Sequence, residues 1–121
     1  MKNKKTLVLG ASSNPSRYSY MAIRSLAAKE HSVVAIGLKE EEVLGIKIQT
    51  KQIPFTNIDT VTLYLNPQRQ RDYYNYVVSL APKRVIFNPG TENPEFYQLL
   101  RVNGIKVEVA CTLVMISTGQ Y

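Results

Sequence analysis

The chain has 121 residues, of which 45% are hydrophobic and 20% charged, and its formal net charge at pH 7 is +6. This predicts one domain spanning residues 1–121 that buries its own core, and the single cysteine, Cys111, excludes an internal disulfide and a cysteine metal cluster. No apolar run reaches the roughly 18 residues of a membrane-spanning helix, and the strand after Lys2, Lys4 and Lys5 is too short for a signal-peptide core, so we expect a cytoplasmic protein.

The first predicted unit is a strand, a turn and a helix. The apolar run at residues 6–9 ends in Gly10, and apolar positions recur at helical spacing over residues 19–30. The apolar run at residues 33–37 is typical of a strand covered on both faces. Strand, helix and strand in this order predict a parallel βαβ unit with a right-handed crossover.

The turn after the first strand is the candidate ligand site. At such a turn, backbone N–H groups and the positive end of the helix dipole face outward together, which favours an anionic group. Gly10 is the only glycine in the turn, so the G-x-G-x-x-G dinucleotide fingerprint is absent. A tight strand-to-helix turn without a ligand therefore remains the alternative.

The rest of the chain alternates predicted strands and helices. Residues 38–45 are predicted to form a polar turn or a single helical turn, and residues 46–48 a short edge strand. The later strands are predicted at residues 61–65, 84–87 and 105–109, and the helices at residues 67–80 and from 94 to about 103. An apolar tail follows at residues 113–116. This order predicts an α/β fold with a doubly wound, mostly parallel sheet.

The dipeptide Asn-Pro occurs four times, each time in the turn after a predicted strand, at Asn14, Asn66, Asn88 and Asn93. These turns share one rim of the sheet, where doubly wound folds bind ligands. Helix capping explains Asn66 and Asn93, because Asn is a good N-cap and Pro suits the first helical position. For Asn88, which precedes Pro89 and Gly90, a ligand-facing role and a plain turn both remain open.

Catalytic groups are scarce on this rim. His31, the only histidine, lies between a helix and the next strand, hence at the opposite edge, which excludes a histidine-dependent triad and a histidine metal site. Glu92 and Glu95 suit the start of a helix, and Cys111 suits packing. No acid–base pair forms, so we expect no metal site and a binding protein rather than an enzyme.

The end of the second strand carries Gly37, Leu38 and Lys39 instead of the acidic residue that holds the ribose of NAD. A lysine there suits an extra phosphate on the ribose, so NADP and coenzyme A both remain candidates, with a solvated surface lysine as the alternative. The positive net charge favours an anionic partner. Nucleic acid is the less favoured partner, because the basic residues are scattered and no RNA-recognition or zinc-finger motif occurs.

Several motifs follow one another along nearly the whole chain: Val8-Leu9-Gly10-Ala11-Ser12-Ser13-Asn14-Pro15, the strand at residues 33–36, Glu42-Val43-Leu44-Gly45, Tyr64-Leu65-Asn66, Asn88-Pro89-Gly90, and Gly104-Ile105-Lys106-Val107 leading to Cys111. In order and spacing the chain resembles the stand-alone CoA-binding protein family. Its members are small Rossmann-like proteins, similar to the CoA-binding domain of the succinyl-CoA synthetase alpha subunit. The resemblance implies a single three-layer Rossmann-like domain that binds coenzyme A or an acyl-CoA.

The resemblance also implies a set of cofactor-binding residues. Those implied near the CoA phosphates are Gly10, Ala11, Ser12, Asn14, Pro15 and Arg17. Those implied near the adenosine part are Gly37, Leu38 and Lys39. The next rim turn contributes Tyr64, Leu65 and Asn66, and Asn88 and Gly90 are implied near the pantetheine arm.

The chain departs from the family pattern in three places. Family members commonly carry Val-Asn-Pro where this chain has Ile36-Gly37-Leu38, an aromatic-Leu-Gln-x-Gly pattern where it has residues 86–90, and Phe-Arg where it has Tyr64-Leu65. The missing arginine puts phosphate affinity in doubt. The chain also lacks anything like the second domain of the synthetase, so ligase activity is not implied.

We therefore expect a protein that binds coenzyme A or an acyl-CoA across the carboxyl rim of the sheet without catalysing a reaction. Two alternatives remain. One is a weak NADP-dependent oxidoreductase. The other is an oligomeric interaction module with a decayed nucleotide pocket, in which exposed tyrosines and the apolar tail at residues 113–116 form a subunit contact.

Overall fold

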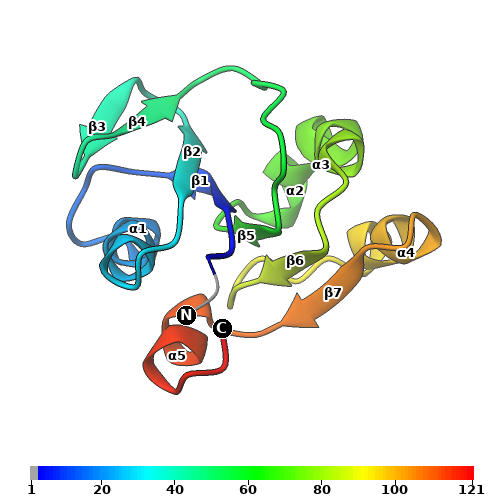
Figure 1. Cartoon of the computed structure of the whole chain (residues 1–121). Helices are drawn as coiled ribbons and strands as arrows, with labels where there is room; N and C mark the ends of the chain where they lie inside the picture. Colours follow the sequence, from blue (N-terminus) through cyan, green and yellow to red (C-terminus); the bar gives the residue numbers. More distant parts are fainter. Residues whose placement is uncertain (1–2) are drawn as a thin grey trace.

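A computed structural model, which describes residues 3–121, shows a seven-stranded sheet with helices on both faces (Figure 1). The strands are β1 (Thr6–Ala11), β2 (Val33–Gly37), β3 (Glu41–Val43), β4 (Ile46–Gln49), β5 (Thr60–Leu63), β6 (Arg84–Phe87) and β7 (Lys106–Val109). The helices are α1 (Tyr18–Ala28), α2 (Pro67–Gln70), the 3₁₀ turn η1 (Arg71–Tyr73), α3 (Tyr74–Leu80), α4 (Pro94–Val102) and α5 (Thr112–Ser117).

The strand order is β3-β4-β2-β1-β5-β6-β7. Every neighbouring pair is parallel except β3 and β4. The chain leaves the central strand β1 toward one edge and returns through β5 toward the other, so the predicted doubly wound α/β fold is confirmed. No helix within residues 3–121 is both long and apolar enough to cross a membrane.

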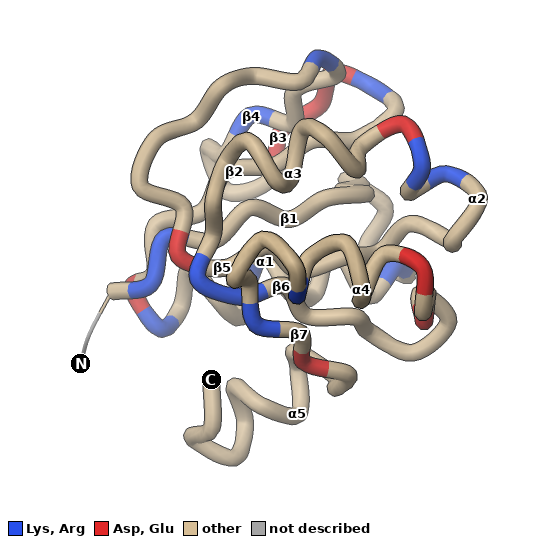
Figure 2. Tube along the Cα trace, turned by 90° about the vertical axis from the view of Figure 1, so that its right-hand side faces the viewer, with Lys and Arg blue, Asp and Glu red and all other residues tan. Residues whose placement is uncertain are grey.

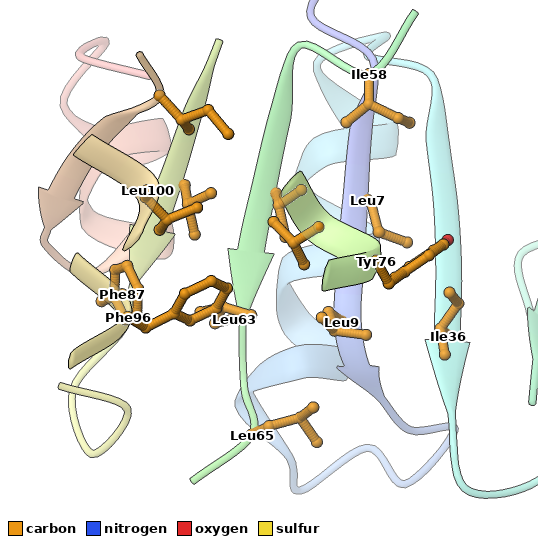
Figure 3. Close-up of a cluster of buried hydrophobic side chains, with 14 residues drawn as sticks. Leu7, Leu9, Ile36, Ile58, Leu63, Leu65, Tyr76, Phe87, Phe96 and Leu100 are labelled. Atoms are coloured by element: carbon orange, nitrogen blue, oxygen red, sulfur yellow. The ribbon is translucent and has the colours of Figure 1, made fainter. Parts of the chain in front are cut away.

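Both faces of the central strand are buried, which explains its uninterrupted apolar run. Leu7 and Leu9 lie in a cluster with Phe87, Phe96 and other side chains from the α3 and α4 face, shown in Figure 3. Val8, which points to the opposite face, packs in a second cluster with side chains from α1 and α5. The alternation of side chains along one strand thus supplies two cores.

The segment at residues 38–45 differs from its prediction. Residues Glu41–Val43 form strand β3, which makes an antiparallel hairpin with β4. The two turn residues, Leu44 and Gly45, have φ values of 51° and 78°, as a two-residue type I′ hairpin requires. Strand β4 is consequently not an edge strand, because it lies between β3 and β2.

The predicted helix over residues 67–80 is broken into α2, η1 and α3. Gln70 marks the break, since its fully buried side chain donates to the carbonyl oxygens of Leu65 and Thr91 at 2.9 and 2.8 Å. The apolar tail at residues 113–116 lies in helix α5, so only part of it is available for the subunit contact considered above. Met115 and Ile116 are buried in the chain's own core, whereas Val114 is 56% exposed.

His31 lies at the amino edge of the sheet, as the sequence predicts. Its Nδ1 accepts a hydrogen bond from the backbone N–H of Lys4 at 2.9 Å, and its ring centroid lies 5.1 Å from that of Tyr121. Burial, followed by the positive charges of Lys4 and Arg84, lowers the pKa of His31. The neutral imidazole is therefore the form that this packing stabilises.

We expect the free energy of unfolding to fall as the pH drops below about 6.5, the ordinary pKa of histidine. The unfolded chain takes up a proton on His31 before the folded chain does, so acid favours unfolding and the contribution is complete above that pH. Urea unfolding between pH 5 and 7.5 measures the effect, with His31→Gln as the control that flattens the dependence. The prediction is wrong if the single imidazole titrates at or above 6.5 in NMR spectra of the folded protein.

Candidate functional site

A cleft of about 830 Å³ opens at the carboxyl rim of the sheet. The loops after β1, β2, β5 and β6 all line it, at the place where the α1 and α2–α3 connections depart to opposite faces. The predicted site residues that line it are Gly10, Ala11, Ser12, Asn14, Arg17, Gly37, Leu38, Lys39, Tyr64, Leu65, Asn66 and Gly90. Four segments far apart in the sequence thus converge on one hollow.

Two glycines form the tight floor of this cleft. A Cβ atom on Gly37 would lie 2.3 Å from the carbonyl oxygen of Ala11. A Cβ on Gly10, whose φ is +96°, would lie 2.9 Å from the carbonyl carbon of Tyr64. Glycine is required at both positions because one backbone passes directly over another. Contacts within the protein therefore explain why glycine occupies these two positions, without any contribution from a ligand.

Short-range hydrogen bonds hold the loop after β1. The hydroxyl oxygen of Ser12 accepts from the N–H of Asn14 at 3.0 Å. The side-chain oxygen of Asn14 in turn accepts from the N–H and the hydroxyl of Ser16, at 3.0 and 2.8 Å. These bonds shape a loop that delivers the chain to the start of α1 at the cleft wall.

The start of α1 carries no side-chain cap. Its N-cap residue is Arg17, and its first turn contains no acidic residue. In contrast, Asn66 caps α2 by accepting from Arg69 N–H, and Asn93 caps α4 by accepting from Phe96 N–H. The first backbone amides of this eleven-residue helix therefore have no side-chain acceptor. Because Arg17 at the helix start also lines the cleft, this end of the helix is suited to bind an anion.

Residues 4–117 match a family model described as the CoA binding domain. The chain belongs to the CoA-binding domain family. Membership confirms the family that the sequence motifs resemble and supports the binding of CoA in general. None of the curated proteins compared with the chain matches it.

Solved structures share the fold of this CoA-binding domain. A crystal structure of an uncharacterized protein is 49% identical, with a TM-score of 0.97 and both chains covered in full. A protein from Thermus thermophilus is 25% identical, with a TM-score of 0.85 over 98% of this chain and 91% of that one. A hypothetical protein from Pyrococcus horikoshii OT3 is 27% identical, with a TM-score of 0.85 over 97% of this chain and 84% of that one.

The cleft of this CoA-binding domain is lined by more cations than acids. Arg17, Lys39 and Arg69 line it, and Glu41 is the acidic residue among the lining residues. The ion pairs within residues 3–121 join other groups, Lys83 with Asp59 and both Arg84 and Lys106 with Glu108. Elsewhere in residues 3–121 the basic residues are dispersed over many segments (Figure 2).

Several lining residues were not predicted from the sequence. They are Tyr18, Ser19, Ile36, Glu41, Arg69, Tyr73 and Thr91, whereas Ser13 and Pro89 lie in turns that the sequence places at the rim. Arg69 carries a signal that could have been used, because it lies in the first turn after the capping Asn66 and hence beside the rim. Glu41 carries no such signal, because the polar sequence of residues 38–45 predicts a turn and not the strand β3.

Two predicted residues, Pro15 and Asn88, do not line the cleft. Asn88 is 2% exposed, and its amide donates to the hydroxyl of Thr62 and the carbonyl of Leu63 at 2.7 and 2.8 Å. Its side-chain oxygen accepts from the N–H of Thr112 at 2.9 Å. The amide of Asn88 is thus used to join β5, β6 and α5 inside the protein.

Three titratable groups near the rim are a tyrosine and two carboxylates that make hydrogen bonds within the protein. Burial raises the pKa of Tyr64 to about 12, so its hydroxyl is neutral near physiological pH. The carboxylate of Glu92 accepts from the N–H of Gly90 at 2.8 Å, and that of Glu95 accepts from the hydroxyl of Tyr74 at 3.0 Å. Within residues 3–121 no group of three or more His, Cys, Asp or Glu side chains is placed to hold a metal.

We expect Gly37→Ala to destabilise this CoA-binding domain by about 3 kcal/mol, because a methyl group cannot fit beside a backbone carbonyl in a packed sheet. Urea unfolding measures the change. Gly45→Ala is the control, because its Cβ would meet nothing within 4 Å and only its left-handed φ opposes the change, at about 1 kcal/mol. Equal losses in the two variants would contradict the steric role of Gly37.

Proposed function

We propose that this protein binds coenzyme A, free or as an acyl thioester, in the rim cleft and holds it without transforming it. The observation that carries the proposal is the uncapped start of α1, which opens onto a cleft lined by Arg17, Lys39 and Arg69. A phosphate group suits both features, because it accepts hydrogen bonds from the free backbone amides and neutralises the cations. Membership of the CoA-binding domain family supports the choice of coenzyme A among phosphorylated ligands.

The proposed pose runs from β2 to β6. The loop at residues 10–16 and Arg17 receive the diphosphate, and Lys39 receives the phosphate on the ribose. Tyr18 and Leu38, which are 68% and 71% exposed, offer apolar surface at the cleft for the adenine ring. The pantetheine arm then passes Leu65 and Gly90, which line the far part of the cleft.

Arg69 offsets the loss of the family arginine in this proposal. Leu65 stands where relatives carry that arginine, and its side chain is buried. Arg69 follows four residues later on α2, is exposed and lines the same cleft. In this proposal the guanidinium of Arg69 takes the place of the family arginine beside the loop after β5, although it comes from a different position of the backbone.

The proposal of binding without chemistry is supported by the groups near the cleft. The Tyr64 hydroxyl is neutral, and His31 lies at the opposite edge of the sheet. Cys111 is at the start of α5 and does not line the cleft. A proton-transfer pair, which most group-transfer reactions need, is therefore not assembled among the described residues that line the cleft.

We expect isothermal titration to detect CoA binding and Ser12→Asp to weaken it about tenfold, equivalent to about 1.4 kcal/mol of repulsion between like charges. An aspartate at position 12 can still accept from the N–H of Asn14, so the loop keeps its shape. Ser117→Asp, an exposed serine on α5, is the control for added charge. Absence of heat with folded wild-type protein and high micromolar CoA would overturn the proposed function.

We expect CoA to bind about tenfold more tightly than 3′-dephospho-CoA, because Lys39 pairs with the extra phosphate. Lys39→Ala should abolish this difference, whereas Lys29→Ala, an exposed lysine outside the cleft, should preserve it. Thermal unfolding with each ligand, and with NADP, gives an independent measurement. Protection by NADP and not by CoA would instead favour the oxidoreductase alternative.

A further inference from the structure

The two edges of the sheet differ in chemistry. On the outer strand β3, Glu41 and Glu42 are both exposed, and like charges oppose pairing with a second copy. On the outer strand β7, Val109 is 56% exposed, and Val102 at the end of the adjacent helix α4 is 73% exposed (Figure 1). Strand β7 contains no proline or bulge, and no strand within residues 3–121 pairs with its outer side.

The backbone of β7 is arranged to accept another strand. The N–H of Lys106 donates to the carbonyl of Lys83 at 3.1 Å, and the N–H of Ala110 donates to the carbonyl of Phe87 at 3.2 Å. Successive residues of a strand point their polar backbone groups to opposite sides. The N–H and C=O of Val107 and Val109 therefore point away from β6, toward the open edge.

Charge selects one antiparallel register for two copies of this strand. Lys106 and Glu108 already pair with each other within one chain at 3.3 Å, and Arg84 also pairs with Glu108. A two-fold axis at Val107 places this Lys106 opposite Glu108 of the second copy, and the same arrangement recurs on the other side of the axis, so each carboxylate gains a second chain's cation beside it. An axis at Glu108 would instead place two glutamates opposite each other, which is unfavourable. The axis at Val107 also suits the backbone, because Val107 is one of the residues whose polar groups face outward.

The exposed valines match in the same register. Val107 packs against the cluster that contains Phe96 and Leu100 of α4, so Val109, two residues further along the strand, faces the same side of the sheet. Antiparallel pairing sets the amino end of one β7 beside the carboxyl end of the other. Val102 lies next to the amino end of β7, and Val109 lies at its carboxyl end. Antiparallel pairing therefore places Val102 of one copy near the exposed Val109 of the other.

We propose that two copies of this chain associate through antiparallel pairing of their β7 strands, with a two-fold axis at Val107. The contact is isologous, so each favourable pair is made twice. Lys106, Val107, Glu108, Val109 and Val102 all lie outside the residues that line the cleft. Both clefts stay open in the pair, and the proposal is independent of what the clefts bind.

Sedimentation velocity over a wide range of protein concentration tests the proposal, with the mass expected to rise from one chain to two. Val109→Lys should raise the dimer dissociation constant by at least about tenfold, because it places a cation in the apolar part of the contact. Val114→Lys is the matched control, since Val114 is also 56% exposed but lies on α5. Its dissociation constant should equal that of the wild type.

Lys106→Glu tests the register. It places a glutamate opposite Glu108 of the second copy and should also weaken the dimer about tenfold, whereas with an axis at Glu108 it would face Ala110 and have little effect. Circular dichroism verifies that each variant remains folded. A wild-type protein that stays monomeric at all concentrations, or a dimer that Val109→Lys leaves intact, would overturn the proposal.

Discussion

The close passage of the Ala11 backbone over Gly37 is the constraint on which the rim depends. It coincides with the irregular register between β1 and β2, where Leu9 pairs with Ile36 and Ala11 pairs with Gly37. The chain leaves β1 at this crossing and continues into the loop that delivers it to α1. Gly10 likewise leaves no room for a Cβ atom beside the backbone of Tyr64, so three parallel strands end in one packed layer beneath the cleft. The floor of the candidate site thus rests on close main-chain contacts.

The parts of the fold that the sequence predicts are those decided by local chemistry. The apolar runs at residues 6–9 and 33–37 identify two neighbouring strands, and Asn66 and Asn93 identify helix starts, because each signal needs only neighbouring residues. The hairpin of β3 and β4 escapes prediction because two adjacent glutamates are poor strand formers, and because leucine is an unusual residue for a left-handed turn position. The break at Gln70 involves a hydrogen bond to the carbonyl of Thr91, which lies 21 residues away in the sequence, as well as one to the nearby carbonyl of Leu65.

In the candidate site, too, the sequence predicts the features that local chemistry decides and misses those that depend on distant contacts. Its loops could be placed from the rule that parallel strands end on a common rim, and most of the proposed residues line the cleft. This rule does not predict which side chains face the cleft and which are buried inside the protein. Asn88 resembles the other Asn-Pro sites in sequence, yet its amide serves Thr62, Leu63 and Thr112. Arg69 lines the cleft because it lies in the first turn of α2, which starts at the cleft with Asn66.

The acidic outer strand β3 has a consequence for how far such sheets can grow. Open sheets with two adhesive edges can add copies without end, as amyloid and other fibrous aggregates do. Here Glu41 and Glu42 repel a further chain at one end. In the β7-paired dimer that we propose, both outer strands would carry these glutamates, which oppose the growth of the pair into a filament.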